Sequence, residues 1–192
     1  MNLETIYFEI KDGRALTSDE QMRLKAIVFA RSAEPYELSQ AVLGLCLVSP
    51  PDPELADSVV DLALEYVLSE DEWQIVCAEW MVLSLSTEWH FPEKLEALCR
   101  EVAARWAYSR FETLFRQCAI VIGEIAAKRH DRELFEFLRQ IGIDALEADN
   151  SAIAEKAAVG CKVALEGAVA DSLRVPNNIA DYLHRVRFAP LQ

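Results

Sequence analysis

Glycine and proline are scarce in this chain of 192 residues, with six and seven copies respectively. Disordered chains and turn-rich all-β domains contain more of both, so the composition argues against these two classes. Long apolar runs are also missing, because runs such as residues 41–48 are far shorter than the ~20 residues that a membrane-spanning helix needs. Residues 1–4 lack the basic and apolar regions of a signal peptide. We therefore expect a folded, soluble, cytoplasmic protein.

Positive charge is the next shortage. The chain has 19 Lys and Arg residues against 32 Asp and Glu residues, which gives a formal net charge of -13. Sequence-independent affinity for nucleic acid comes from clustered Lys and Arg, so this balance disfavours direct binding of DNA or RNA. The same charge suits a basic protein partner. It also fits the simpler explanation that many cytosolic proteins are acidic for solubility alone.

The residue types that carry metal or nucleophilic chemistry are few and scattered. The cysteines are odd in number, form no C-x-x-C pair and lie in apolar helical segments, which indicates packing in a reducing compartment. No histidine has a second ligand at metal-binding spacing on its own helix. We expect no catalytic residue, no metal and no cofactor. The residues concerned are Cys46, Cys77, Cys99, Cys118, Cys161, His90, His130 and His184.

Helix signals follow one another along most of the chain. Capping boxes, in which Ser or Thr is followed three residues later by Glu, begin at Thr17, Ser69 and Ser109. Proline at the first helical position opens further helices at Pro35 and Pro53. Residues 3–10 fit either a strand or a helix face. The predicted helices span about residues 17–32, 35–48, 53–69, 72–87, 92–106, 109–125, 131–143, 150–165 and 177–186.

Small residues recur at similar positions in alternate helices. The pairs 77–78, 118–119 and 157–158 are spaced about 40 residues apart, and two helices per 40 residues is typical of HEAT and armadillo repeats. Residues 116–123, which read Arg-Gln-Cys-Ala-Ile-Val-Ile-Gly, and in part residues 41–44 carry the pattern of a HEAT second helix. Small residues there would let adjacent layers approach closely.

On these motifs the chain resembles HEAT/armadillo-like α-helical repeat proteins, over about Thr17 to Ala168. The resemblance implies an all-α fold: a right-handed α-solenoid of about four helix pairs plus a short C-terminal helix. The whole chain, residues 1–192, is expected to form one repeat domain, with residues 1–16 of uncertain structure. An irregular helical bundle with accidental spacing is the alternative.

Candidate binding residues combine tryptophan with glutamate. Trp73 and Trp80 share a helix face, either as a core stripe or as an aromatic anchor flanked by Glu72 and Glu79. In HEAT proteins the second helices line the concave surface. The resemblance therefore implies that the exposed acids of those helices lie there, namely Glu72, Glu79, Glu112, Glu124, Glu155 and Glu166.

These features predict a non-enzymatic protein-binding module with a basic protein as its partner, and no direct contact with nucleic acid or membrane. The most specific form is an acidic bacterial immunity or antitoxin-type inhibitor of a basic toxin, since acidic partners associate quickly with basic clefts and block them. Two alternatives remain. One is a lyase-like enzyme or ligand carrier on a HEAT scaffold, and the other is a general assembly or regulatory scaffold.

Overall fold

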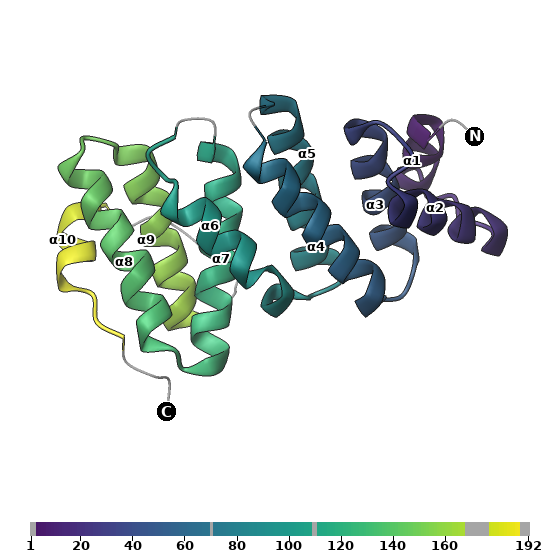
Figure 1. The fold of residues 1–192 in the computed structure, drawn as a ribbon. Helices are drawn as coiled ribbons and strands as arrows, with labels where there is room; N and C mark the ends of the chain where they lie inside the picture. The colour runs from purple at the N-terminus through teal and green to yellow at the C-terminus, as the bar shows by residue number, and fades with distance from the viewer. Residues whose placement is uncertain (1–2, 70, 109–110, 168–176, 189–192) are drawn as a thin grey trace. The chain divides into compact units, whose positions relative to one another are not determined.

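The computed structural model describes residues 3–69, 71–108, 111–167 and 177–188, and within these ranges all regular structure is helical (Figure 1). The predicted all-α class is therefore confirmed. Two short elements differ from α-helix: the π-helical turn η1 and the 3₁₀ turn η2. The elements are α1 (Leu3–Lys11), α2 (Ser18–Ala30), α3 (Pro35–Val48), α4 (Pro53–Leu68), α5 (Glu72–Leu83), η1 (Ser84–Glu88), η2 (Pro92–Leu95), α6 (Glu96–Ala104), α7 (Glu112–Arg129), α8 (Arg132–Glu147), α9 (Ser151–Glu166) and α10 (Ile179–Arg185).

The ambiguous N-terminal segment is a helix, α1. Ile6 and Ile10, one helical turn apart, are both buried, whereas Phe8 between them is 49% exposed. A strand would have placed all three side chains on one face, because successive side chains alternate. Gly13 then turns the chain with φ +97, a conformation that glycine adopts without strain. The strand alternative is therefore wrong.

The predicted capping boxes have different outcomes. At α2 the box forms: the Glu20 amide donates to the Thr17 hydroxyl, and the Glu20 carboxylate accepts from the Thr17 amide at 2.9 Å. That amide bond, with further bonds from Arg14 and the Thr17 hydroxyl, lowers the pKa of Glu20 to about 2. At α5 the predicted box is wrong, because Asp71 caps the helix by accepting from the Trp73 amide at 2.8 Å.

The third predicted box begins at Ser109, which lies outside the described residues. There α7 begins at Glu112 with Phe111 in the N-cap position. The predicted continuous helix over residues 72–87 also differs from the structure, since α5 ends at Leu83 and continues as η1. Ser84 and Thr87 donate to carbonyls four residues earlier, which is a pattern that bends helices.

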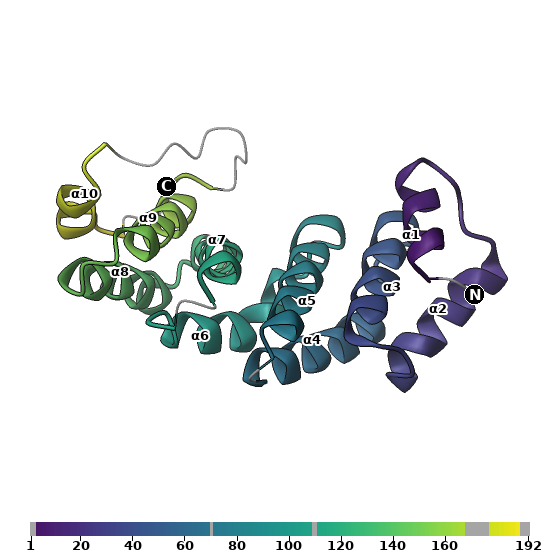
Figure 2. The same cartoon turned by 90° about the horizontal axis from the view of Figure 1, so that it is seen from above.

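The helices form two compact units, residues 1–95 (unit 1) and residues 96–192 (unit 2). In unit 1, α3 lies between α1 and α5, and α4 packs on α5 (Figure 2). The Trp89 indole N–H donates to the Ser49 carbonyl at 3.2 Å and ties the end of η1 to the end of α3. In unit 2, α9 packs on α7 and α8, with α10 on α8 and α9. A solenoid running through the whole chain remains a prediction.

Unit 2 shows the close helix approach that its small residues predicted. A Cβ atom built on Gly160 of α9 would lie 2.3 Å from the Ala119 carbonyl oxygen of α7. One built on Gly123 of α7 would lie 2.3 Å from the Gly160 carbonyl oxygen. The two backbones therefore touch where only hydrogen atoms fit, and α7 and α9 pack at this point through glycine and alanine.

Replacing Gly160 with alanine tests this contact. We expect Gly160→Ala to lower the free energy of unfolding by about 1–3 kcal/mol, because the added methyl group meets backbone and forces the helices apart. The matched control is Gly142→Ala in the same unit, where the added methyl group meets side chains rather than backbone, namely the end of Leu183 at 2.8 Å and the Ala157 Cβ at 3.1 Å, and should cost less. Urea denaturation of both variants measures the difference, and equal losses would contradict the close approach.

Candidate functional site

The cysteines and histidines form no reactive cluster in the described part of the chain. All five cysteines are free and buried, and burial raises the pKa of Cys46 and raises that of Cys161 to about 12. A buried thiol with a raised pKa is a poor nucleophile, so the predicted packing role of these residues fits their surroundings. The three histidines are exposed at or beyond helix ends. Among the described residues, no group of three His, Cys, Asp or Glu could hold a metal ion.

The acidic charge is divided very unevenly between the two units. Residues 1–95 hold 18 of the 32 Asp and Glu residues but only six of the 19 Lys and Arg residues. Residues 96–192 hold the other 14 acids and 13 cations. Unit 1 therefore has an excess of 12 negative charges and unit 2 an excess of one. The net charge of the whole chain does not show this difference, whereas the net charge of each half does.

An aromatic cluster lies on unit 1, the acidic unit. The Tyr36 ring of α3 stacks on the Trp73 ring of α5, with centroids 5.7 Å apart, and contacts the Trp80 ring at the same separation. The two tryptophan rings meet edge to face at 6.4 Å. Trp73 is 50% exposed and Trp80 is half-buried, so Trp73 is not a core residue. The contribution of Tyr36 was missed because it lies on a different helix, and its pairing with α5 is a tertiary contact.

Next to this cluster is a cavity of about 330 Å³ between α1, α3 and α5. Its walls are mostly aromatic and aliphatic, and its one amide side chain is that of Gln40. Gln40 is 2% exposed, and its carbonyl oxygen, Oε1, is buried and accepts no hydrogen bond from any residue that the structure describes. Gln40 was not predicted as a site residue, although it is a polar residue beside the apolar face of its helix. The lining residues are Tyr7, Phe8, Tyr36, Gln40, Leu43, Trp80 and Leu83.

Two of the predicted binding acids adjoin the aromatic cluster without a compensating cation. Glu72 precedes Trp73 and Glu79 precedes Trp80 on α5, and neither forms an ion pair with any residue that the structure describes. Other acids of unit 1 are paired: Lys25 contacts Asp52 at 2.6 Å, and further pairs join Arg31 to Glu65 and Lys94 to Asp57. The carboxylates of α5 therefore leave negative charge beside exposed aromatic rings.

The four predicted acids of unit 2 lie in a different electrostatic setting. Glu112 forms an ion pair with Lys156 at 2.7 Å, which joins α7 to α9, and Glu166 lies 3.6 Å from Lys162. Glu124 is half-buried on α7, and Glu155 is exposed on α9. Cations therefore compensate at least Glu112 and Glu166. That the acids of both units lie on one concave surface remains a prediction.

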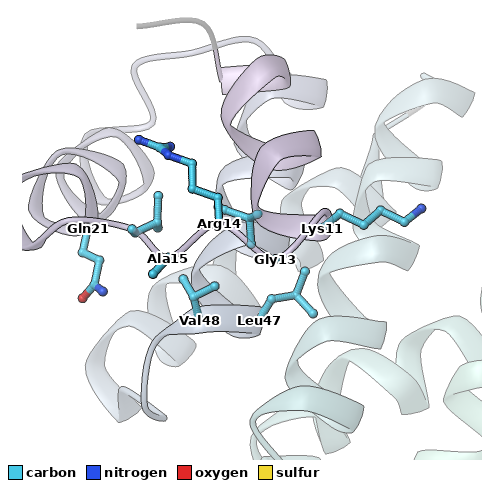
Figure 3. A pocket seen from close by; sticks show the side chains of 9 residues that line it. Lys11, Gly13, Arg14, Ala15, Gln21, Leu47 and Val48 are labelled. Atoms are coloured by element: carbon cyan, nitrogen blue, oxygen red, sulfur yellow. The ribbon is translucent and has the colours of Figure 1, made fainter.

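A second cavity of unit 1, of about 470 Å³, lies between the end of α1, the following loop and the end of α3. Figure 3 shows Lys11 and Arg14 extending in different directions there rather than converging on one point. Arg14 is already paired with Glu9 at 3.1 Å and with Glu20 at 2.5 Å. This cavity therefore offers no convergent polar groups, and the cavity at Gln40 is the better candidate site.

The chain has no match among known protein-family models, curated proteins or solved structures. Its function is therefore inferred from its own residues. In the part of the chain that the structure describes, none of the helices combines the length and the apolar character needed to cross a membrane.

Alanine substitution distinguishes a surface anchor from a core residue. We expect Trp73→Ala to lower the free energy of unfolding by only about 1 kcal/mol, since it removes ring contacts from a half-exposed side chain. Trp89→Ala, in the same unit, should cost about 3–5 kcal/mol, because Trp89 is 2% exposed and its loss leaves a cavity. Urea denaturation measures both, and a comparable loss for Trp73→Ala would show that Trp73 is a core residue.

Proposed function

We propose that this chain is a non-enzymatic protein-binding module whose unit 1 binds a basic protein. The observation that carries the proposal is the partly exposed cluster of Tyr36, Trp73 and Trp80, in which Trp73 is 50% exposed. Glu72 and Glu79 precede the two tryptophans on α5 and form no ion pair with the described residues. The cluster belongs to the unit that holds nearly all of the excess negative charge of the chain.

Each part of this surface has a physical role in binding. Tryptophan and tyrosine supply large contact areas at low cost in side-chain entropy, and they dominate the energy of many protein interfaces. Carboxylates beside them select a basic partner and disfavour an acidic one. The 12 excess charges of unit 1 act at longer range, because they attract a basic protein before contact and raise the association rate at low salt.

The most specific form of the proposal is inhibition of a basic toxin. A toxin that acts on nucleic acid needs a basic cleft, and unit 1 would compete for that cleft with its own carboxylates. A regulatory or assembly scaffold would use the same surface, so the identity of the partner distinguishes the two roles.

Charge-neutral substitutions test the binding surface. Glu72→Gln combined with Glu79→Gln removes both carboxylates with little change in shape. Partners captured by the wild-type chain would be identified by mass spectrometry, purified and titrated by calorimetry. We expect a basic partner whose affinity falls about tenfold, or ~1.4 kcal/mol, in the double variant, and falls further as salt is added.

The matched control is Glu54→Gln combined with Asp61→Asn, which removes two exposed carboxylates from α4 of the same unit and gives the same net charge. This variant should bind within about threefold of wild type, because it changes only the long-range field. Equal losses in both double variants would show that general charge rather than the aromatic cluster carries the affinity. Capture of no basic protein would contradict the proposal altogether.

A further inference from the structure

Exposed apolar side chains of unit 1 gather on three neighbouring helices. Of the eight large apolar side chains that are exposed in the described part of the chain, four lie on α1, α3 and α5, and α3 lies between the other two helices (Figure 2). They are Phe8 (49% exposed), Leu47 (44%), Trp73 (50%) and Leu83 (41%). Phe8 and Leu83 also line the cavity of about 330 Å³, so this cavity opens onto the same surface. Apolar side chains gathered on the outside of a folded protein mark a binding site for another macromolecule.

These side chains form two rows along α3 and α5. Tyr36, Leu43 and Leu47 lie on one side of α3, because they are seven and then four residues apart, and this side is about 16 Å long. On α5, Trp73 and Trp80 are likewise seven residues apart. The two rows, with the α1 residues of the cavity wall, are called the apolar groove below. The groove consists of Tyr7, Phe8, Tyr36, Leu43, Leu47, Trp73, Trp80 and Leu83.

Negative charge lies along the α5 side of the groove. Glu79 comes four residues before Leu83, and side chains at this spacing are neighbours on the surface of a helix. Glu72 comes seven residues before Glu79 and therefore lies on the same side of α5. Neither carboxylate forms an ion pair with a described residue, and none of the six Lys and Arg residues of unit 1 lines the cavity.

This charge selects among the possible occupants of the groove. A basic segment would pair with Glu72 and Glu79 and would be attracted by the 12 excess negative charges of unit 1. A second copy of the chain would instead bring another 12 negative charges to the same surface, and the two copies would repel each other. Charge complementarity therefore favours a basic partner over a dimer.

The walls of the groove favour a helical occupant. The backbone amides and carbonyls of α1, α3 and α5 are bonded within their own helices, so the groove presents no strand edge with which an extended segment could pair. A helix forms its backbone bonds internally and can bury one apolar face. Its apolar residues at positions i, i+3 or i+4, and i+7 have the same spacing as the rows of α3 and α5, and they can pack between these rows.

We propose that the apolar groove binds an amphipathic helix of the basic partner, with one large apolar side chain of that helix in the cavity and its Lys or Arg residues beside Glu72 and Glu79. A volume of about 330 Å³ is at the small end of the range of ligand sites, which suits a single side chain. This inference rests on the proposed function and names the kind of segment that the surface recognises.

The aromatic side of the groove is ordered before a partner arrives. The rings of Tyr36, Trp73 and Trp80 contact one another in the free chain, with centroids 5.7, 5.7 and 6.4 Å apart. Each ring limits the motion of the other two. Less side-chain entropy is therefore lost when a helix packs on them.

The test uses synthetic peptides of about 18 residues, or five helical turns. The basic amphipathic peptide has leucine on one face and lysine on the other, and two further versions carry phenylalanine or methionine at the central apolar position. A fluorescent label on each peptide reports its binding to the full chain by fluorescence anisotropy. We expect at least one of the three to bind, with an affinity that falls as salt is added.

Three control peptides separate the parts of the proposal. One has the same residues in an order that forms no apolar face, one has glutamate in place of lysine, and one has a central proline that breaks the helix. Each should bind about tenfold more weakly or worse.

Paired substitutions locate the peptide on the chain. Phe8→Gln combined with Leu83→Gln removes two exposed apolar side chains from the groove, and glutamine is a good helix former. We expect this double variant to bind the basic amphipathic peptide about tenfold more weakly. The matched control is Met22→Gln combined with Leu68→Gln, which removes side chains that are 62% and 52% exposed from α2 and α4 of the same unit. It should bind within about threefold of wild type.

Circular dichroism should show the helix content of wild type in both double variants, because all four side chains are exposed. The single substitutions Phe8→Gln and Leu83→Gln are measured in the same way, and each should give part of the loss in affinity.

Equal binding of the peptide without an apolar face would show attraction between opposite charges alone and would overturn the inference. Equal binding of the proline peptide would indicate an extended occupant and would overturn it as well. Equal affinities of the two double variants would place the peptide outside the groove. A wild-type dimer in sedimentation velocity that is absent in the Phe8→Gln, Leu83→Gln variant would make a second copy the occupant and would also overturn the inference.

The proposed function and this inference can fail separately. If a captured basic partner depends on Glu72 and Glu79, binds the Phe8→Gln, Leu83→Gln variant as well as wild type, and no amphipathic peptide binds, the proposed function stands and this inference falls. If the amphipathic peptide binds at the groove but no basic partner is captured, the proposed function is the part that fails.

Discussion

Burial of α3 between its neighbouring helices is the constraint on which the site depends. Most of the residues from Leu38 to Cys46 are buried, because α1 and α2 cover one part of the helix and α5 another. This position buries Gln40, and it brings Tyr36 against two rings of α5. Both the unpaired acceptor and the aromatic cluster therefore follow from packing on a single helix. A looser arrangement would let water reach Gln40 and would separate the rings.

The second feature that bears on function is the uneven division of charge between the two units. Carboxylates in excess repel one another and destabilise the compact state of unit 1, whereas unit 2 is nearly balanced. In unit 1, pairs such as Lys25 with Asp52 relieve part of that repulsion, while Glu72 and Glu79 form no ion pair with any described residue. A cationic partner would pair with these two carboxylates and would reduce the repulsion within unit 1.

The helices could be predicted from local chemistry, whereas the contacts between helices could not. The Thr17 cap was predictable because donor and acceptor lie three residues apart, and Pro35 and Pro53 open helices for equally local reasons. At α5 the local prediction was wrong because Asp71, two residues after Ser69, accepts from the Trp73 amide instead. Glu72 and Glu79 were predicted from the sequence as binding residues, together with Trp73 and Trp80. Tyr36, Gln40 and the pairing of Glu112 with Lys156 depend on tertiary contacts that periodicity cannot supply.

Selection of peptides from a random display library on the intact chain tests the central claim most directly, because it presumes neither the partner nor the binding surface. We expect the enriched peptides to be basic and to lose binding when Trp73 is replaced by alanine. Enrichment of acidic or uncharged peptides, or of basic peptides that bind the Trp73→Ala variant as well as wild type, would contradict it.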